Sequence, residues 1–220
     1  MKTIVLNEDK YNRLFEAMDD IFNYDELKSI NSYSGKVKYC KEHLGMPIGN
    51  GSSRICFQID DEWILKLAKN DKGIAQNEVE GQADYYKDSL CIFPLVDYEN
   101  SDTENYTFII SEYVLPAKAK DFIVCLDVTF NGWVNFVMQS ASQYMRYMNG
   151  TFMSWEQFEQ MIEENDTWRD LNEYLTNYQI PVGDICRLAN LGMVLRDNEP
   201  QIVILDSGYN DEVAKNFYKN

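Results

Sequence analysis

A lysine in the middle of an apolar segment constrains this chain more than any other single residue. Lys66 lies within residues 62–68, where Ile64, Leu65 and Leu67 surround it. A strand that is apolar on both faces is buried, and a buried ammonium group costs free energy unless an opposite charge pairs with it. The alternative is an edge strand, whose lysine prevents pairing with other chains. The apolar neighbours favour the buried strand, so we expect an acidic partner elsewhere in the chain.

The acidic partner is expected from residues 74–86, which have a helical pattern and follow the lysine strand. Glu78 and Glu80 lie on different faces of that helix. Either carboxylate can reach Lys66, so both remain candidates. An acidic helix face that is simply solvated is the alternative interpretation.

A glycine-containing turn precedes the lysine strand. Gly49 and Gly51 are followed by residues 55–59, where apolar and polar positions alternate, and a short connection joins this strand to the strand of Lys66. The pattern predicts a β-hairpin. Glycines in such a turn allow backbone N–H groups to approach phosphate oxygens, although ordinary hairpins use glycine as well.

A second group of polar residues lies near the end of the sequence. Asp184 is followed six residues later by Asn190, and Asp206 ends an apolar run. Two carboxylates and an amide suit a hard cation, and an acid of this kind can also orient a hydroxyl group for phosphoryl transfer. Taken alone, the residues are ordinary turn formers.

The composition excludes several classes of protein. With 220 residues, of which 45% are hydrophobic, the chain can form one core or two small lobes, and its net charge of −16 disfavours nucleic-acid binding. A single histidine, His43, and five cysteines without paired spacing disfavour a zinc site or a histidine-dependent hydrolase. No signal peptide and no apolar run of about 20 residues is found, so we expect a cytoplasmic protein without membrane contact.

Strand patterns gather between residues 45 and 115, and helical patterns dominate after them. The expected helices lie at 8–22, 35–44, 74–86, 118–126 and 133–148, followed by one that begins at a capping box of Ser154 and Gln157 and one that ends at Pro181. The expected strands include the hairpin, residues 91–96 and residues 106–116. The change in composition near residue 115 predicts a boundary between two lobes of an α+β protein.

In this order the motifs resemble the protein-kinase-like fold, and most closely the small divergent kinase-like proteins of phages and bacteria. They are the glycine turn with Arg54 where a third glycine often stands, Lys66, a helix glutamate, residues 112–114, Asp184 with Asn190, and residues 206–208. The resemblance implies one bilobal domain. Residues 1–115 would form an N-terminal lobe with leading helices, glycine loop, five-stranded antiparallel sheet, one main helix and a hinge at 112–116. Residues 116–220 would form a small, truncated, mostly helical C-terminal lobe.

The resemblance also implies the residues that bind ATP and Mg²⁺. The phosphates would be covered by Gly49, Gly51, Ser52 and Ser53, and held by Lys66 with Glu80 beside it. The backbone of Glu112 and Val114 would bind adenine. The catalytic residues would be Lys66, Asp184, which orients the acceptor hydroxyl, and Arg187, which neutralises the transferred phosphate, while Asn190 and Asp206 would hold the metal.

Departures from the family pattern leave the activity open. Val182 and Gly183 replace the usual His-Arg pair, Ser207 replaces a phenylalanine, and the few residues after Asp206 suggest neither an activation segment nor the helices that bind peptides. We expect an ATP- and Mg²⁺-dependent phosphotransferase that acts on an unidentified hydroxyl acceptor. The alternative is a nucleotide-binding pseudokinase or interaction protein, phage-encoded and aimed at a host factor. Nucleotidyl transfer would use the same pocket, and the oligomeric state stays open.

Overall fold

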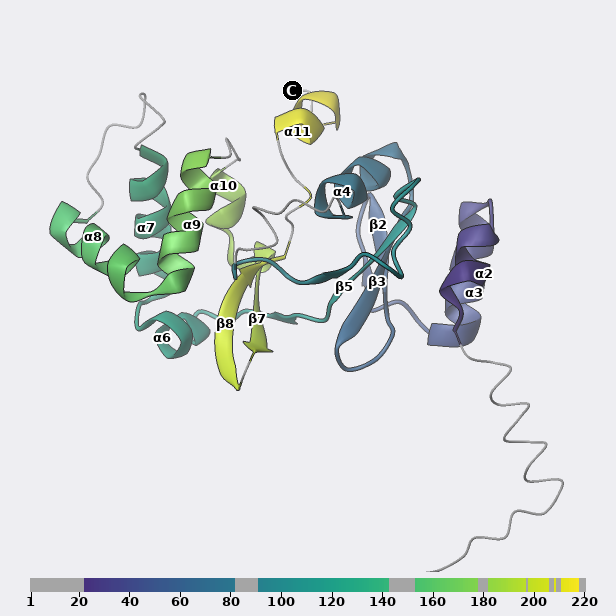
Figure 1. Cartoon of the computed structure of the whole chain (residues 1–220), viewed down its shortest axis with the longest axis horizontal. Helices are drawn as coiled ribbons and strands as arrows, with labels where there is room; N and C mark the ends of the chain where they lie inside the picture. Colours follow the sequence, from purple (N-terminus) through teal and green to yellow (C-terminus); the bar gives the residue numbers. More distant parts are fainter. Residues whose placement is uncertain are drawn as a thin grey trace, which may run out of the picture.

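Two sheets lie between two groups of helices in the structure, a computed structural model (Figure 1). It describes residues 22–81, 91–142, 153–177, 182–196, 198–205, 208 and 211–217. The predicted helix at 8–22 lies outside these residues except for Phe22. Within the described residues, no helix is both long and apolar enough to cross a membrane.

The first sheet has five antiparallel strands, which confirms the prediction of an α+β protein with such a sheet. Its strands, in the order β1-β2-β3-β5-β4, are β1 (Gly49–Asn50), β2 (Arg54–Gln58), β3 (Trp63–Ala68), β5 (Phe108–Glu112) and β4 (Val96–Asp97). Lys66 pairs with Cys56 on one side and Ile109 on the other. It therefore lies in the central strand and not at an edge, as the apolar neighbours predicted.

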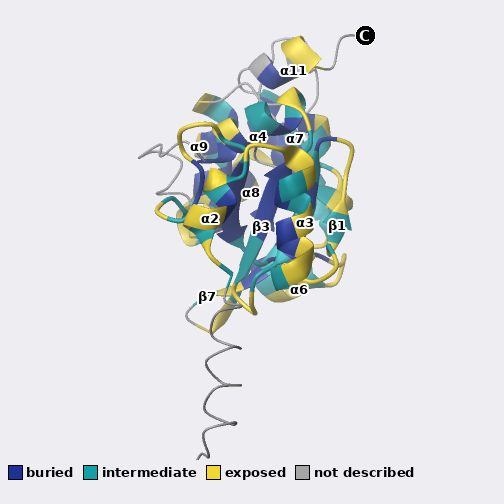
Figure 2. Cartoon of the chain, turned by 90° about the vertical axis from the view of Figure 1, so that its right-hand side faces the viewer, coloured by how far each residue is buried: buried dark blue, intermediate teal, exposed yellow. Residues whose placement is uncertain are grey.

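Two helices cover one face of this sheet. They are α2 (Tyr24–Ser29), which was not predicted, and α3 (Tyr33–Leu44), which matches the predicted helix at 35–44 and ends at Gly45 with φ of 84°. Asn23 and Ser32 cap their N-termini. Leu27 and Cys40 pack there against inward-facing side chains of β2, β3 and β5. Figure 2 looks onto these helices, with β3 behind them in the colour of buried residues.

The other face of the sheet carries helix α4 (Asp71–Gly81), which packs against β3 and β5. It begins three residues earlier than the predicted helix at 74–86. The Asn70 side chain accepts a hydrogen bond from the Gly73 N–H at 3.1 Å, so this amide satisfies one donor of the first turn. Residues 82–86 of the predicted helix lie outside the described part of the chain.

Two strand predictions were wrong in extent. Residues 91–95 form a turn, and only the last residue of the predicted strand at 91–96 belongs to β4. Ile92 and Phe93 are buried in the helical core instead, so their apolar character reflects burial and not a strand. The predicted strand at 106–116 divides into β5 and β6 (Leu115–Pro116), which join different sheets.

A second sheet, absent from the sequence prediction, follows the connecting segment at 112–116. It contains β6, β7 (Leu191–Arg196) and β8 (Glu199–Ile204), all antiparallel. Its β7–β8 hairpin lies beside the helical core, to which Leu191, Ile202 and Ile204 contribute. The region after residue 116 is therefore mainly helical, with a small sheet at its inner side.

Five of the remaining described helices form a second core, separate from that of the first sheet. They are α6 (Asp121–Leu126), α7 (Phe130–Ser142), α8 (Trp155–Glu164), α9 (Asp166–Asn177) and α10 (Val182–Ile185), with a 3₁₀ turn η1 (Leu188–Asn190). Helix α11 (Asp211–Phe217) lies instead against α4. Trp133, Phe136 and Trp168 are buried at its centre. The capping box of Ser154 and Gln157 is present at the start of α8, as predicted.

Candidate active site

A buried ion pair lies between the first sheet and α4. The Lys66 ammonium is 2.7 Å from Glu80 Oε2, and the two residues are 7% and 2% exposed. Glu78 is exposed on another face of α4, so Glu80 is the partner of Lys66. A buried carboxylate and ammonium at this distance compensate each other, whereas either one alone would be strongly unfavourable.

Arg54 shares the same carboxylate, which the sequence had not indicated. Its guanidinium lies 2.7 Å from Glu80 Oε1. The register places Arg54 opposite Ala68 and Cys56 opposite Lys66, so Arg54 and Lys66 project from the same face of the sheet. Side chains alternate between the two faces of a strand. Arg54 stands two residues before Cys56, the partner of Lys66, so this alternation could have placed Arg54 and Lys66 on the same face.

A third donor to Glu80 comes from the distant end of the chain. The Gly208 N–H donates to Glu80 Oε1 at 3.2 Å, across 128 positions of sequence. A Cβ atom at Gly208 would lie 2.6 Å from the Gln76 carbonyl oxygen and 2.9 Å from Glu80 Oε1, so only glycine fits there. Asp206 and Ser207, just before it, lie outside the described residues.

A cavity of about 320 Å³ opens between the two sheets, beside the ion pair. Its lining comes from β2, β3, the connecting segment, η1 and the end of β8: Arg54, Cys56, Ile64, Lys66, Pro94, Glu112, Val114, Ala189, Asn190 and Leu205. Four residues predicted for the nucleotide site thus meet at one cavity, namely Lys66, Glu112, Val114 and Asn190.

The connecting segment forms one wall of the cavity and is held in place by β7. Arg196 of β7 contacts the Glu112 carboxylate, with Nη2 2.5 Å from Oε2. Val114 packs against Gly192, where a Cβ atom would lie only 2.1 Å from Val114 Cγ1. Among the described residues, no acceptor is found for the Val114 N–H. This amide is therefore able to bind a ligand.

The predicted glycine loop is a tight turn that does not line the cavity. Its turn is closed by a hydrogen bond from the Gly51 N–H to the Arg54 carbonyl at 2.9 Å. Lys69 Nζ donates to the Gly51 carbonyl at 2.8 Å. The Ser53 hydroxyl donates to Gln76 Oε1 at 2.6 Å, so Ser53 fixes the turn to α4, while Gly49 lies in β1 and Ser52 is exposed.

Asp184 and Arg187 lie next to the cavity residue Asn190 but outside the cavity lining. Asp184 belongs to the short helix α10, and its carboxylate is 3.3 Å from Arg187 Nη1. The Asn190 side-chain amide donates to the Asp184 carbonyl at 3.1 Å, which fixes the loop between them.

Of the two predicted metal ligands, only Asn190 can be placed. Within the described residues, no three His, Cys, Asp or Glu side chains are grouped as a metal site. Asp206 is outside those residues, so its predicted role stays a prediction.

Comparisons with protein-family models, with curated proteins and with solved structures found no match.

Proposed function

We propose that the cavity between the sheets binds ATP with Mg²⁺ and that the protein transfers the terminal phosphoryl group to a hydroxyl acceptor. The observation that carries this proposal is the buried Lys66–Glu80 pair in the central strand, at the wall of a cavity that also contains Val114 and Asn190. These residues are far apart in sequence. Their meeting at one cavity supports the protein-kinase-like assignment that the motif order suggested.

The cavity suits a nucleotide in size and in the distribution of its groups. Its volume lies within the range of about 300–1,000 Å³ usual for small-molecule pockets. Ile64, Val114 and Leu205 offer apolar surface for a base, and the Val114 N–H offers a donor to a ring nitrogen. Lys66 and Arg54 offer two cations to phosphate oxygens, in a chain whose net charge is −16.

The metal would be held by Asn190 together with Asp206. When bound, Mg²⁺ neutralises phosphate charge during transfer. Asn190 would contribute its side-chain oxygen to such a site, because its side-chain N–H already donates to the Asp184 carbonyl. Asp184 would then orient the acceptor from the loop that Asn190 fixes.

One observation favours a second candidate, a protein that binds the nucleotide without transferring phosphate. The Asp184 carboxylate is paired with Arg187 and does not line the cavity. Transfer requires that this carboxylate reach an acceptor hydroxyl next to the terminal phosphate. If the pair persists when nucleotide is bound, the cavity serves binding alone.

Labelled nucleotides separate these functions. The protein is incubated with Mg²⁺ and with γ- or α-labelled ATP, alone and with a cytosolic extract, beside Lys66→Ala, Asp206→Ala and the surface control Lys38→Ala. We expect γ-label transfer by the wild type and by Lys38→Ala, and none by the two site variants. Transfer of the α-label would instead identify nucleotidylation.

Thermal unfolding with and without ATP and Mg²⁺ tests binding itself. A ligand at 100 times its Kd stabilises the folded protein by about 2.7 kcal/mol. We expect the midpoint of the wild type to rise and that of Lys66→Ala to rise less. Stabilisation without any label transfer would favour the binding protein, and the absence of stabilisation would contradict the nucleotide site.

A further inference from the structure

A second concave surface lies on the outer side of the connecting segment. This groove has a volume of about 400 Å³ and is lined by Asp61, Glu62, Trp63, Leu95, Glu112, Tyr113, Leu115, Met193, Val194 and Leu195. Tyr113 and Leu115 line the groove, whereas Val114 between them lines the nucleotide cavity. The groove and the cavity therefore lie on opposite sides of the connecting segment, and of their lining residues they share only Glu112.

Three leucines from different parts of the chain are exposed in the groove. Leu95 and Leu115 are each 51% exposed, and Leu195 is 68% exposed. They come from the turn before β4, from β6 and from β7. Single exposed leucines are common, but three that meet in one concave surface, beside Trp63 and Tyr113, are typical of a site that a partner covers.

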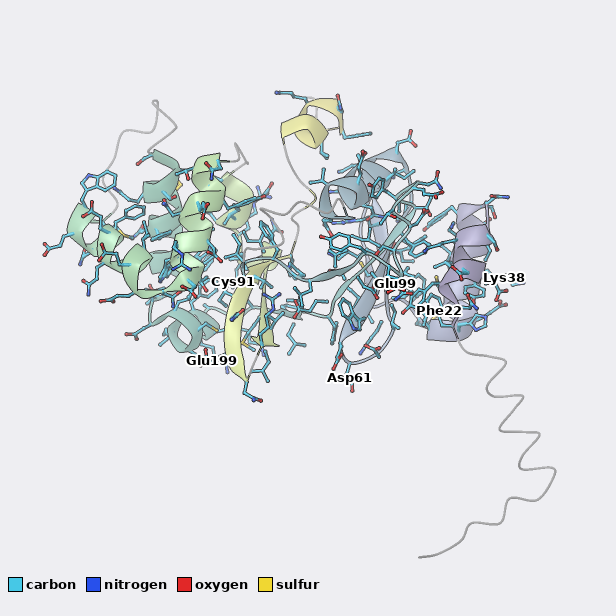
Figure 3. The ribbon with its side chains drawn as sticks, viewed as in Figure 1. Phe22, Lys38, Asp61, Cys91, Glu99 and Glu199 are labelled. Carbon is cyan, nitrogen blue, oxygen red and sulfur yellow. The ribbon has the colours of Figure 1, made fainter. Side chains whose placement is uncertain are left out.

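The groove is acidic. Among the residues that the structure describes, its lining contains three carboxylates and no basic side chain. Glu112 is paired with Arg196, but Asp61 and Glu62 are exposed on the β2–β3 turn. The Asp60 carboxylate accepts hydrogen bonds from the Glu62 and Trp63 N–H groups, both at 2.8 Å, which fixes the turn. Figure 3 shows Asp61 and Glu199 at the ends of their hairpins on the same side of the molecule.

This charge decides which occupant fits. A second copy of a chain with net charge −16 would be repelled, as would a nucleic acid or an anionic membrane. A basic segment is attracted to the acidic rim, and its apolar side chains can cover the leucines. We propose that the groove binds a short peptide segment of a partner protein that combines Lys or Arg with two or three large apolar residues.

Selection from a displayed library of random twelve-residue peptides tests this proposal on the full chain. We expect the enriched peptides to carry Lys or Arg beside Leu, Ile, Met or Phe. Each enriched peptide is then synthesised, and its affinity is measured for the wild type, for Leu115→Lys and for Leu195→Lys. These variants place a like charge in the groove, so we expect binding at least tenfold weaker.

Ile123 and Val124 provide matched controls, because they are apolar, 54% and 70% exposed, and lie on α6 away from the groove lining. Ile123→Lys and Val124→Lys are expected to bind like the wild type. A double variant, Asp61→Lys with Glu62→Lys, changes only an exposed turn. It therefore still tests the groove if a leucine variant fails to fold. It is expected to weaken binding and to reduce its dependence on salt.

Three results would overturn the proposal: no enriched peptide, enrichment of acidic or uncharged peptides, or binding that the groove variants leave unchanged. A wild-type dimer that Leu195→Lys dissociates would also overturn it, since the occupant would then be a second copy. Leu195→Lys and the Asp61→Lys, Glu62→Lys variant lie outside the connecting segment and the cavity lining, so their stabilisation by ATP is expected to equal that of the wild type. A failure of nucleotide binding leaves the peptide result unaffected.

Discussion

At the scale of single residues, Glu80 joins both cations of the candidate site to a distant backbone N–H. Its carboxylate accepts from Lys66, Arg54 and the Gly208 N–H. Breaking an isolated buried pair costs about 3–5 kcal/mol. In Lys66→Met, Glu80 still accepts from Arg54 and Gly208, so we expect the free energy of unfolding to fall by less than this range, on the order of 1–3 kcal/mol. In Glu80→Ala, both cations lose this carboxylate, so we expect the full loss of about 3–5 kcal/mol.

Urea unfolding of both variants measures this order. Lys38→Met is the control, because Lys38 forms an exposed pair with Glu42 and is expected to change stability by less than about 0.5 kcal/mol. Equal losses for Lys66→Met and Glu80→Ala would show that Arg54 does not share the carboxylate.

Two glycines give a second test at this scale. A Cβ at Gly192 would press on Val114, whereas nothing lies within 4 Å of a Cβ at Gly183. We expect Gly192→Ala to cost about 1–3 kcal/mol and to weaken ATP binding by shifting the cavity wall. Gly183 lies in α10, and Gly183→Ala is expected to leave stability unchanged or to raise it slightly. Thermal unfolding with and without ATP measures both effects, and similar losses for the two variants would contradict the close contact.

The sequence predicts part of this site because some contacts follow from local patterns. Lys66 is conspicuous as a charge in an apolar strand, and the helix with Glu80 follows directly. The choice between Glu78 and Glu80 needs the angle at which α4 crosses the sheet, which no periodicity specifies. The role of Arg196 has no local signal, because Glu112, Cys91 and Phe93, to which it joins β7, are more than 80 positions away.

At the scale of elements, Arg196 joins three segments. From β7 it contacts the Glu112 carboxylate at the end of β5 and donates to the carbonyls of Cys91 at 2.8 Å and Phe93 at 2.7 Å. We expect Arg196→Met to cost about 2–4 kcal/mol, since it removes the cation beside a partly buried carboxylate and one donor from each of two carbonyls. Arg196→Lys should recover only part of the loss, because an ammonium cannot reproduce the planar fork. Denaturant unfolding decides this, and a loss below about 0.5 kcal/mol for Arg196→Met would contradict the role.

The loop before β5 gives a pH-dependent prediction. Burial alone would raise the pKa of Asp102, but hydrogen bonds from the Thr107 hydroxyl and the Asn105 and Thr107 N–H groups, with the Lys36 charge, hold this pKa below its usual value. A lowered pKa in the folded state means that the stabilisation is present above the unfolded pKa of about 3.9 and is lost as the pH falls through the folded value.

We therefore expect part of the stability lost on acidification from pH 5 to pH 2 to come from Asp102. Asp102→Asn should flatten the dependence of unfolding free energy on pH, and Asp61→Asn, in an exposed turn, should not. Parallel profiles for Asp102→Asn and the wild type would contradict this source of acid sensitivity.

The errors in the predicted elements have two causes. Residues 91–96 and 106–116 are apolar enough for strands, but apolar runs also occur in buried turns and across junctions between sheets. The second sheet was missed because β6 has only two residues and pairs with β7, more than 70 positions later. Helices with caps and clear periodicity, such as α3 and α8, were predicted correctly because their signals are local.

At the scale of the whole molecule, the described residues form two large hydrophobic cores, one among the helices after residue 116 and one between the first sheet and helices α2 and α3. A third, small cluster of the described residues consists of Val114, Val194 and Val203. We expect hydrogen exchange to show different opening free energies for the five-stranded sheet and for α7 with α9. ATP with Mg²⁺ should increase protection in both cores, because residues attached to each line the cavity. Protection confined to one core would place the nucleotide elsewhere.

The contact between Gly208 and Glu80 also bears on how the chain is made. Glu80 lies 14 positions after Lys66, so both partners of the buried pair leave the ribosome almost together. The Gly208 N–H follows 128 positions later. At about 5–20 residues per second, this interval lasts roughly 6–26 seconds. The carboxylate of Glu80 therefore receives its donor from Gly208 only after a segment made 128 positions later folds back onto α4.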